Sequence, residues 1–265
     1  MLQTAKCIVF KVGTSTLTHK SGKTNLRCME SLVSVLADLM NAGVRVALVT
    51  SGAIGVGMGK LGLRERPADT AGKQAAATVG QCELMFMYDK FFAQFGYNVG
   101  QLLITRADVE NPERRQNLVQ TFDQLFAYGV IPIINENDAV AVEEIVYGDN
   151  DSLSAVVAAL IGADALVILT ETDGLYTANP QKDPGARRIP VVAEITAEIR
   201  ACAGGAVSGL GTGGMVTKLH AAELAGAAGI DTYVISGADP RDIYRLRDGE
   251  SLGTRFIGRG REQHA

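Results

Sequence analysis

Residues 7–16 read Cys-Ile-Val-Phe-Lys-Val-Gly-Thr-Ser-Thr, a short apolar run that ends in a lysine, a glycine and hydroxyl side chains. A short apolar, β-branched run before a glycine turn is typical of a strand that is buried on both faces. The runs that we interpret as strands are Cys7–Phe10, Val44–Val49, Asn98–Ile104, Val130–Ile134, Ala165–Leu169 and Thr232–Ile235. The stretches between them that we interpret as helices are Leu26–Met40, Ala71–Phe95, Arg114–Tyr128, Asp151–Ile161 and Met215–Ala228. This alternation predicts βαβ units, and therefore a mostly parallel sheet with helices on both faces.

Composition and charge limit the class of protein. The chain has 265 residues, 47% of them hydrophobic, and its 30 glycines far outnumber its 7 prolines, which indicates ordered structure with many tight turns. A net charge of −4 offers no basic surface for nucleic acid. The most apolar stretch, residues 155–169, is too short to span a bilayer, and no signal peptide precedes the first strand. We therefore expect a single domain over residues 1–265, in a soluble cytoplasmic protein that binds neither nucleic acid nor membrane.

Several common catalytic motifs are absent from the sequence. The four cysteines, Cys7, Cys28, Cys82 and Cys202, form no CxxC pair and have no nearby histidine, so we expect reduced thiols and no metal site. There is no GxxxxGK[ST] phosphate loop, no GxGxxG after the first strand, and no HRD or DFG motif of protein kinases. A nucleotide would have to be bound by a different scaffold.

Polar and glycine-rich segments follow the predicted strands, at the edge of a parallel sheet where ligands bind. These segments are Lys11–Thr16, Thr50–Ala53, Asn135–Asp138, Gly148–Asp151 and Thr170–Gly174. Asn and Asp are common in turns and helix caps, which accounts for some of them, Asp149 included. Their number exceeds what capping needs. It suits a ligand with an ammonium group, or an array of carboxylates that orients lysines.

The segment Ser208–Gly214, Ser-Gly-Leu-Gly-Thr-Gly-Gly, favours the binding of a phosphate. Its glycines let backbone N–H groups approach an anion, and the positive end of the following helix points at the same place. Lys218, one turn into that helix, would add a full charge, and Lys11 beside Gly13 is a second candidate contact. The alternatives are a flexible turn before a helix, and a lysine at a strand end whose charge reaches solvent.

The histidines, His19, His220 and His264, neighbour no candidate nucleophile. A carboxylate acceptor would need no general base, because its pKa of about 4.3 leaves it ionised at neutral pH. The barrier would be electrostatic, since two anions must meet. Two lysines and Mg²⁺ are the groups expected to lower such a barrier.

Together these segments resemble the amino acid kinase family. The match rests, in the expected order along nearly the whole chain, on Lys11–Ser15, Val49–Ile54, Ile134–Val140, Gly148–Ala155, Gly174–Ala178 and Ser208–Met215. Within the family, Ile134–Val140 (INENDAV) and Gly148–Ala155 (GDNDSLSA) point to the members that phosphorylate free glutamate. The resemblance implies a three-layer αβα sandwich with a mostly parallel central sheet. Its N-terminal part would bind mainly glutamate and its C-terminal part mainly ATP.

The resemblance also implies roles for single residues. Lys11 and Lys218 would flank the transferred phosphoryl group, and Asp151 would hold both lysines. The implied glutamate-binding residues are Ser51, Gly52, Ala53, Asp138 and Asn150. The implied ATP-binding residues are Lys11, Thr170, Glu171, Thr212, Gly213, Gly214, Met215, Val216, Thr217 and Lys218, with Mg²⁺ bound mainly through the phosphates. Glu171 stands where familiar members have aspartate, and Asp173 where a lysine can occur, which leaves the adenine side open.

The implied reaction is the ATP-dependent phosphorylation of the γ-carboxylate of L-glutamate, which gives L-glutamyl 5-phosphate, the first intermediate towards proline. Proline would be a feedback inhibitor, and the protein would form a homo-oligomer, a dimer or a tetramer. Many members carry a C-terminal PUA domain, and we expect the form without it. The nearest alternatives are acetylglutamate, aspartate and uridylate kinases of the same fold. A non-catalytic amino-acid sensor would not need Lys11, Asp151 and Lys218 together, and a dinucleotide-dependent dehydrogenase lacks its fingerprint here.

Overall fold

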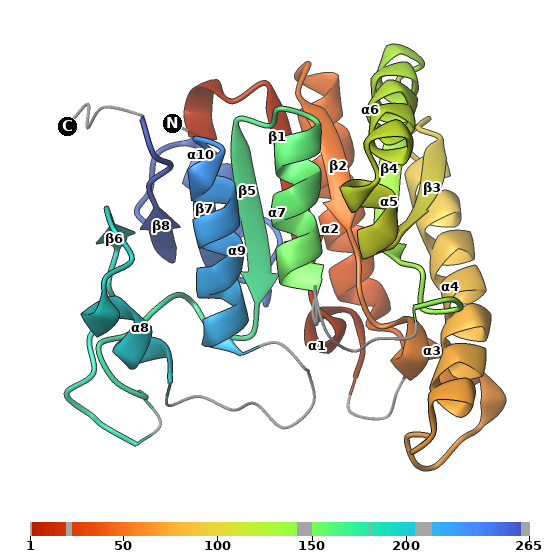
Figure 1. The fold of residues 1–265 in the computed structure, drawn as a ribbon, viewed down its shortest axis with the longest axis horizontal. Coiled ribbons are helices and arrows are strands. Elements are labelled where there is room, and N and C mark those ends of the chain that lie inside the picture. Colours follow the sequence, from red (N-terminus) through yellow and green to blue (C-terminus); the bar gives the residue numbers. More distant parts are fainter. Residues whose placement is uncertain (1, 20–22, 142–149, 181, 205–213, 261–265) are drawn as a thin grey trace.

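The computed structural model describes residues 2–19, 23–141, 150–180, 182–204 and 214–260. Its middle layer is an eight-stranded sheet in the order β3-β4-β2-β1-β5-β7-β8-β6 (Figure 1). The strands are β1 Cys7–Val12, β2 Arg45–Val49, β3 Val99–Ile104, β4 Ile131–Glu136, β5 Ala165–Thr170, β6 Val191–Val192, β7 Asp231–Ser236 and β8 Thr254–Phe256. Each described pair of neighbouring strands is parallel except β7 with β8.

Helices cover both faces of this sheet (Figure 1). They are η1 Leu2–Thr4, α1 Thr14–Leu17, α2 Leu26–Asn41, α3 Ala53–Leu61, α4 Thr70–Ala93, α5 Arg106–Glu110, α6 Pro112–Ala127, α7 Asn150–Leu160, α8 Ala197–Ala203, α9 Met215–Ala227 and α10 Asp242–Arg247. Side chains of α1 to α4 and α10 share one hydrophobic core with the sheet, and those of α5 to α9 share the other. The predicted fold class, an αβα sandwich with a mostly parallel sheet, is therefore confirmed.

Side chains alternate between the two cores along β1, which explains the orientation of its lysine. Ile8 and Phe10 belong to the core beneath α2, whereas Cys7 and Val9 belong to the core beneath α7 and α9. Successive residues of a strand point to opposite faces of the sheet. Lys11 has the parity of Cys7 and Val9, so its side chain lies on the side of α7 and α9.

Each predicted strand and helix is present, with ends that differ by at most two residues. The sequence reasoning missed the short elements, namely η1, α1, α3, α5, α8, α10, β6 and β8. Helix α3 is the instructive case, because Gly55, Gly57 and Gly59 give it poor helix propensity. Its packing on α4 depends on glycine. A Cβ atom on Gly57 would lie 1.8 Å from the carbonyl oxygen of Ala76 in α4.

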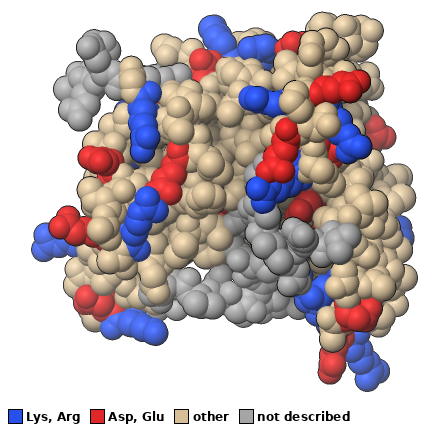
Figure 2. Space-filling model, viewed as in Figure 1, with Lys and Arg blue, Asp and Glu red and all other residues tan. Residues whose placement is uncertain are grey.

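The surface in the orientation of Figure 1 carries charges of both signs, scattered singly or in opposite pairs (Figure 2). Among the described residues of that face, the lysines and arginines form no continuous basic area. None of the helices within the described ranges has the length and hydropathy needed to cross a membrane.

Candidate active site

The sheet reverses its winding direction at β1, so the carboxyl end of that strand is a topological switch point. β2 flanks β1 on one side and β5 on the other, and Lys11 pairs in register with Val49 and Ile168. Open α/β sheets bind ligands at such a switch point. The loops after β1 and β2 and the first turns of α1, α3, α7 and α9 gather at this edge (Figure 1).

A buried cluster of two lysines and one aspartate lies at this point. Asp151, in the first turn of α7, has no solvent exposure, and its Oδ1 lies 2.6 Å from Nζ of Lys11. Its Oδ2 accepts from Nζ of Lys218 at 3.1 Å and from Oγ1 of Thr217 at 2.8 Å. Burial by itself would raise the pKa of Asp151. The charges of Lys11 and Lys218 outweigh it and lower the pKa from an ordinary 3.8 to about 2.

The two lysines carry two positive charges and Asp151 carries one negative charge, so the cluster has an excess of one positive charge. Lys11 is 7% exposed and Lys218 is 4% exposed, so neither ammonium group is well hydrated. An unbalanced buried charge is costly unless a counter-ion is supplied. The arrangement therefore suits an anionic ligand.

Backbone N–H groups near the cluster add to this preference for anions. The N-cap residues of α3 and α9 are Gly52 and Gly214, and neither helix has a side-chain cap. Four other helices, α2, α4, α6 and α8, are capped by the side chains of Asn25, Asp69, Asn111 and Thr196, whereas α1 and α10 also lack such a cap. Uncapped first-turn N–H groups and the helix dipole together bind phosphate and carboxylate groups.

A chain of amides lies beside the lysines. Nδ2 of Asn150, the residue before Asp151, lies 2.9 Å from the carbonyl oxygen of Thr50, 2.8 Å from Oγ of Ser51 and 2.9 Å from Oδ1 of Asn135, so these three acceptors share its two hydrogens. Its own Oδ1 is buried and has no hydrogen-bond partner among the described residues. Leaving a buried acceptor unpaired costs about 1–3 kcal/mol. A ligand that donates hydrogen bonds would recover this free energy.

Asp138 lies nearby, on a cavity of about 370 Å³ between α4, β3 and the residues after β4. Gln81 of α4 also lines this cavity, whereas Ser51 and Asn150 do not, so the cavity adjoins the amide chain. Burial raises the pKa of Asp138, and the charge of Arg66 opposes the shift. A cationic group on a ligand would stabilise the ionised form of this carboxylate.

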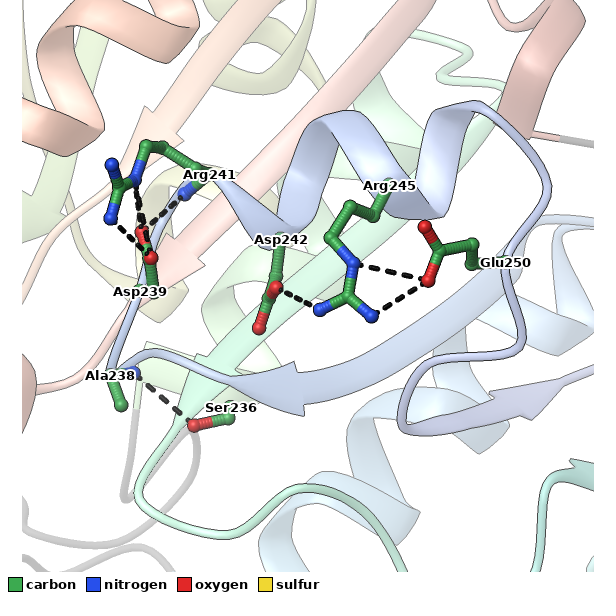
Figure 3. Close-up of polar contacts among 7 residues, drawn as sticks. All are labelled: Ser236, Ala238, Asp239, Arg241, Asp242, Arg245 and Glu250. Atoms are coloured by element: carbon green, nitrogen blue, oxygen red, sulfur yellow. Dashed lines mark hydrogen bonds and ion pairs between the residues drawn. The ribbon is translucent and has the colours of Figure 1, made fainter.

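The ends of β5 and β7 lie at the same edge of the sheet, on the side of β1 opposite to β2. Thr170 ends β5, and its carbonyl oxygen accepts from the backbone N–H of Gly237 at 2.7 Å. Glu171 follows on the surface. Two ion-paired groups shape the chain after β7, Arg241 with Asp239, and Arg245 with both Asp242 and Glu250 (Figure 3). These arginines are exposed and already paired, so they organise the turn and are unsuited to holding a phosphate.

The structure brings most of the predicted site residues to one edge of the sheet. Lys11, Asp151 and Lys218 are in direct contact, and Ser51 with Asn150 lies beside them. Gly214, Met215, Val216 and Thr217 form the start of α9, whereas Thr212 and Gly213 lie outside the described residues. Asp173 accepts from the hydroxyl group of Tyr176.

Sequence reasoning missed two contributors from α4, Gln81 and Tyr88. Oε1 of Gln81 accepts from Nδ2 of Asn135 at 2.8 Å, and the hydroxyl group of Tyr88 lies 2.7 Å from Oγ1 of Thr50. The available signal was a glutamine at a core position of a helix. In the described part of the chain, no group of three His, Cys, Asp or Glu residues is placed to hold a metal ion.

Comparisons with known proteins agree with this geometry. Residues 6–236 match the amino acid kinase family. The glutamate 5-kinase of Moorella thermoacetica is 54% identical over 263 residues, which cover 99% of this chain and 70% of that protein. The glutamate 5-kinase of Clostridium perfringens is 48% identical over 97% of both chains. The crystal structure of UMP kinase from Bacillus anthracis superimposes with a TM-score of 0.64 at 17% identity, over 96% of this chain and 97% of that one, which supports the fold alone.

Proposed function

Since the chain belongs to the amino acid kinase family, we propose that it transfers the γ-phosphoryl group of ATP to the side-chain carboxylate of free L-glutamate. The product is L-glutamyl 5-phosphate, the first intermediate of proline biosynthesis. The observation that carries the proposal is the buried cluster of Lys11, Asp151 and Lys218, whose excess positive charge lies directly beside the amide chain of Asn150.

The two lysines are the catalytic residues of this proposal. The acceptor carboxylate and the γ-phosphoryl group are both anions, so their approach is opposed by charge, and no proton has to be removed. Lys11 and Lys218 approach from opposite ends of the chain and stabilise the charge on the transferred group. Asp151 touches neither reactant. It is a positioning residue, because each of its oxygens holds one ammonium group.

The amide chain and Asp138 bind the amino-acid end of glutamate. An ammonium group has three N–H donors and no acceptor, so it matches the unpaired Oδ1 of Asn150 and the carboxylate of Asp138. Ser51 accepts from Asn150, and its hydroxyl hydrogen remains available for a carboxylate. The backbone N–H groups at Gly52 and Ala53, at the uncapped start of α3, are further carboxylate donors.

ATP binds on the other side of β1, at the ends of β5 and β7. Thr170 and Glu171 line the nucleotide, and the first turn of α9 from Gly214 to Lys218 binds the phosphates. Thr212 and Gly213 belong to this proposal by sequence. Mg²⁺ would enter with ATP, held mainly by phosphate oxygens, because these are the hard oxygen ligands that this ion prefers.

The experiment that tests the activity traps the labile product. The protein is incubated with ATP, Mg²⁺, glutamate and hydroxylamine, and we expect γ-glutamyl hydroxamate to form in proportion to enzyme. Parallel reactions replace glutamate with N-acetylglutamate, aspartate or UMP, with ADP release as the measurement. Preference for any of these acceptors over glutamate would refute the proposal.

A second measurement tests the glutamate-binding residues. Asp138→Asn keeps the shape of the side chain and removes its charge, so we expect the KM for glutamate to rise at least tenfold with the KM for ATP nearly unchanged. Equal rises in both would contradict the assignment. Proline also carries an α-ammonium and an α-carboxylate group, and we propose that it inhibits at the same site. Inhibition that does not weaken as glutamate is raised would contradict this part.

A further inference from the structure

Two polar side chains on the inner face of α4 lie beneath the amide chain. Gln81 is 8% exposed and Tyr88 is fully buried. They are seven residues apart, two helical turns, and therefore lie on the same face of α4. Apolar residues normally occupy such positions. Each of the two contacts a residue that accepts from Asn150, since Gln81 bonds to Asn135 and Tyr88 bonds to Thr50.

The hydrogen bond between Gln81 and Asn135 is linked, through Asn135, to Asn150 in the proposed substrate site. Oε1 of Gln81 accepts from Nδ2 of Asn135, so Oδ1 of Asn135 faces the other way. There it accepts from Nδ2 of Asn150 at 2.9 Å and from the backbone N–H of Glu136 at 2.9 Å. Because Asn150 donates through Nδ2, its Oδ1 is left as the unpaired acceptor. If the amide of Asn135 were turned over, its Nδ2 would face Nδ2 of Asn150, and two donors would meet. Asn150 would then lose the hydrogen bond to Asn135 that supports its orientation.

We propose that Gln81 is a positioning residue for amino-acid binding. Its carboxamide oxygen holds Asn135 in the orientation that, together with the carbonyl oxygen of Thr50, turns Nδ2 of Asn150 inward and leaves its Oδ1 as an acceptor for the substrate ammonium group. The inference rests on the proposed function for the identity of the substrate. The side-chain nitrogen of Gln81 is buried and has no hydrogen-bond partner among the described residues, so the role belongs to the oxygen.

Two substitutions separate the oxygen from the rest of the side chain. Gln81→Met keeps the length and removes the acceptor, which leaves Nδ2 of Asn135 buried and unpaired. We expect the KM for glutamate to rise about tenfold, with kcat within about threefold and the KM for ATP within about twofold of wild type. Gln81→Glu keeps an oxygen where Asn135 donates, and we expect it to restore the KM for glutamate to within about threefold of wild type. Gln120→Met, on the exposed surface of α6, is the matched control and should behave as wild type.

The wild-type protein is measured first in the same hydroxamate assay. No glutamate-dependent product from the wild type would refute the proposed function, and the inference with it. An active wild type with an unchanged glutamate KM in Gln81→Met would overturn the inference alone. Equal rises in both KM values together with a lower melting temperature would overturn it in favour of a purely structural role. Gln81→Glu as impaired as Gln81→Met would also overturn it, since the oxygen would then not be the group that matters.

Discussion

Removal of the Asp151 charge is the perturbation whose consequences the structure defines best. Asp151→Asn leaves two buried ammonium groups without a counter-charge, because Lys11 and Lys218 both pair with this carboxylate. The fall of its pKa from 3.8 to about 2 corresponds to roughly 2–3 kcal/mol of favourable interaction in the folded state. Breaking a buried ion pair on one side costs about 3–5 kcal/mol. We therefore expect the free energy of unfolding to fall by about 2–5 kcal/mol.

Lys218→Met should behave differently, because it leaves Asp151 balanced by Lys11 alone. The excess positive charge is removed, so we expect a smaller loss of stability than in Asp151→Asn. Both single variants should lower kcat by about 10²–10³, the typical cost of losing one preorganised group that stabilises charge in the transition state. In the double variant, the loss of stability should fall short of the sum of the single losses by about 1–3 kcal/mol, and the loss of kcat should be less than their product.

Urea denaturation without nucleotide measures stability, and saturating hydroxamate kinetics measure kcat. The matched control is Asp231→Asn, at the far end of β7, which breaks a partly buried ion pair in which Asp231 lies 2.7 Å from Arg255. It should reduce stability and leave kcat within about twofold of wild type. Additivity of the two site variants within about 0.5 kcal/mol would refute the claim that Asp151 organises Lys218.

Three further outcomes are expected. Tyr88→Phe should lower the free energy of unfolding by about 1–2 kcal/mol, because it leaves the buried hydroxyl group of Thr50 without its hydrogen-bond partner Tyr88. A urea midpoint equal to that of wild type would contradict this prediction. The pKa of Asp151 is depressed in the folded state, so the ionised carboxylate stabilises the folded protein fully above about pH 4, and this stabilisation is lost as the pH falls through about 2. The difference in the free energy of unfolding between wild type and Asp151→Asn should therefore shrink over that range. A difference that stays constant with pH would contradict this prediction. Gly57→Ala should destabilise the protein by about 1–3 kcal/mol, because its Cβ would lie 1.8 Å from a carbonyl oxygen of α4. Gly55→Ala, whose Cβ has its nearest contact at 3.7 Å, should be neutral or stabilising. Similar melting temperatures of the two variants would contradict the close contact between α3 and α4.

The sequence by itself determined the layered α/β fold, because strand and helix periodicities are local properties. The apolar runs Cys7–Phe10 and Ala165–Leu169 are buried on both faces, and their composition predicts strands without any knowledge of their partners. It also named Lys11, Asp151 and Lys218, since these lie in segments that resemble a known family. The local pattern cannot supply the distances between them, and it leaves the charge balance of the cluster undetermined.

Only the tertiary structure decided how these residues meet. The parity of Lys11 on β1 turns its side chain towards α7 and α9, and the two lysines that share Asp151 are about two hundred residues apart in sequence. Helix α3, rich in glycine, gave no helical signal because its stability comes from backbone contact with α4. Sequence reasoning did not identify Gln81 for a similar reason, since its hydrogen-bond partner Asn135 lies 54 residues away in the sequence. The role of a buried amide depends on the donors and acceptors around it, and packing brings these together from distant parts of the chain.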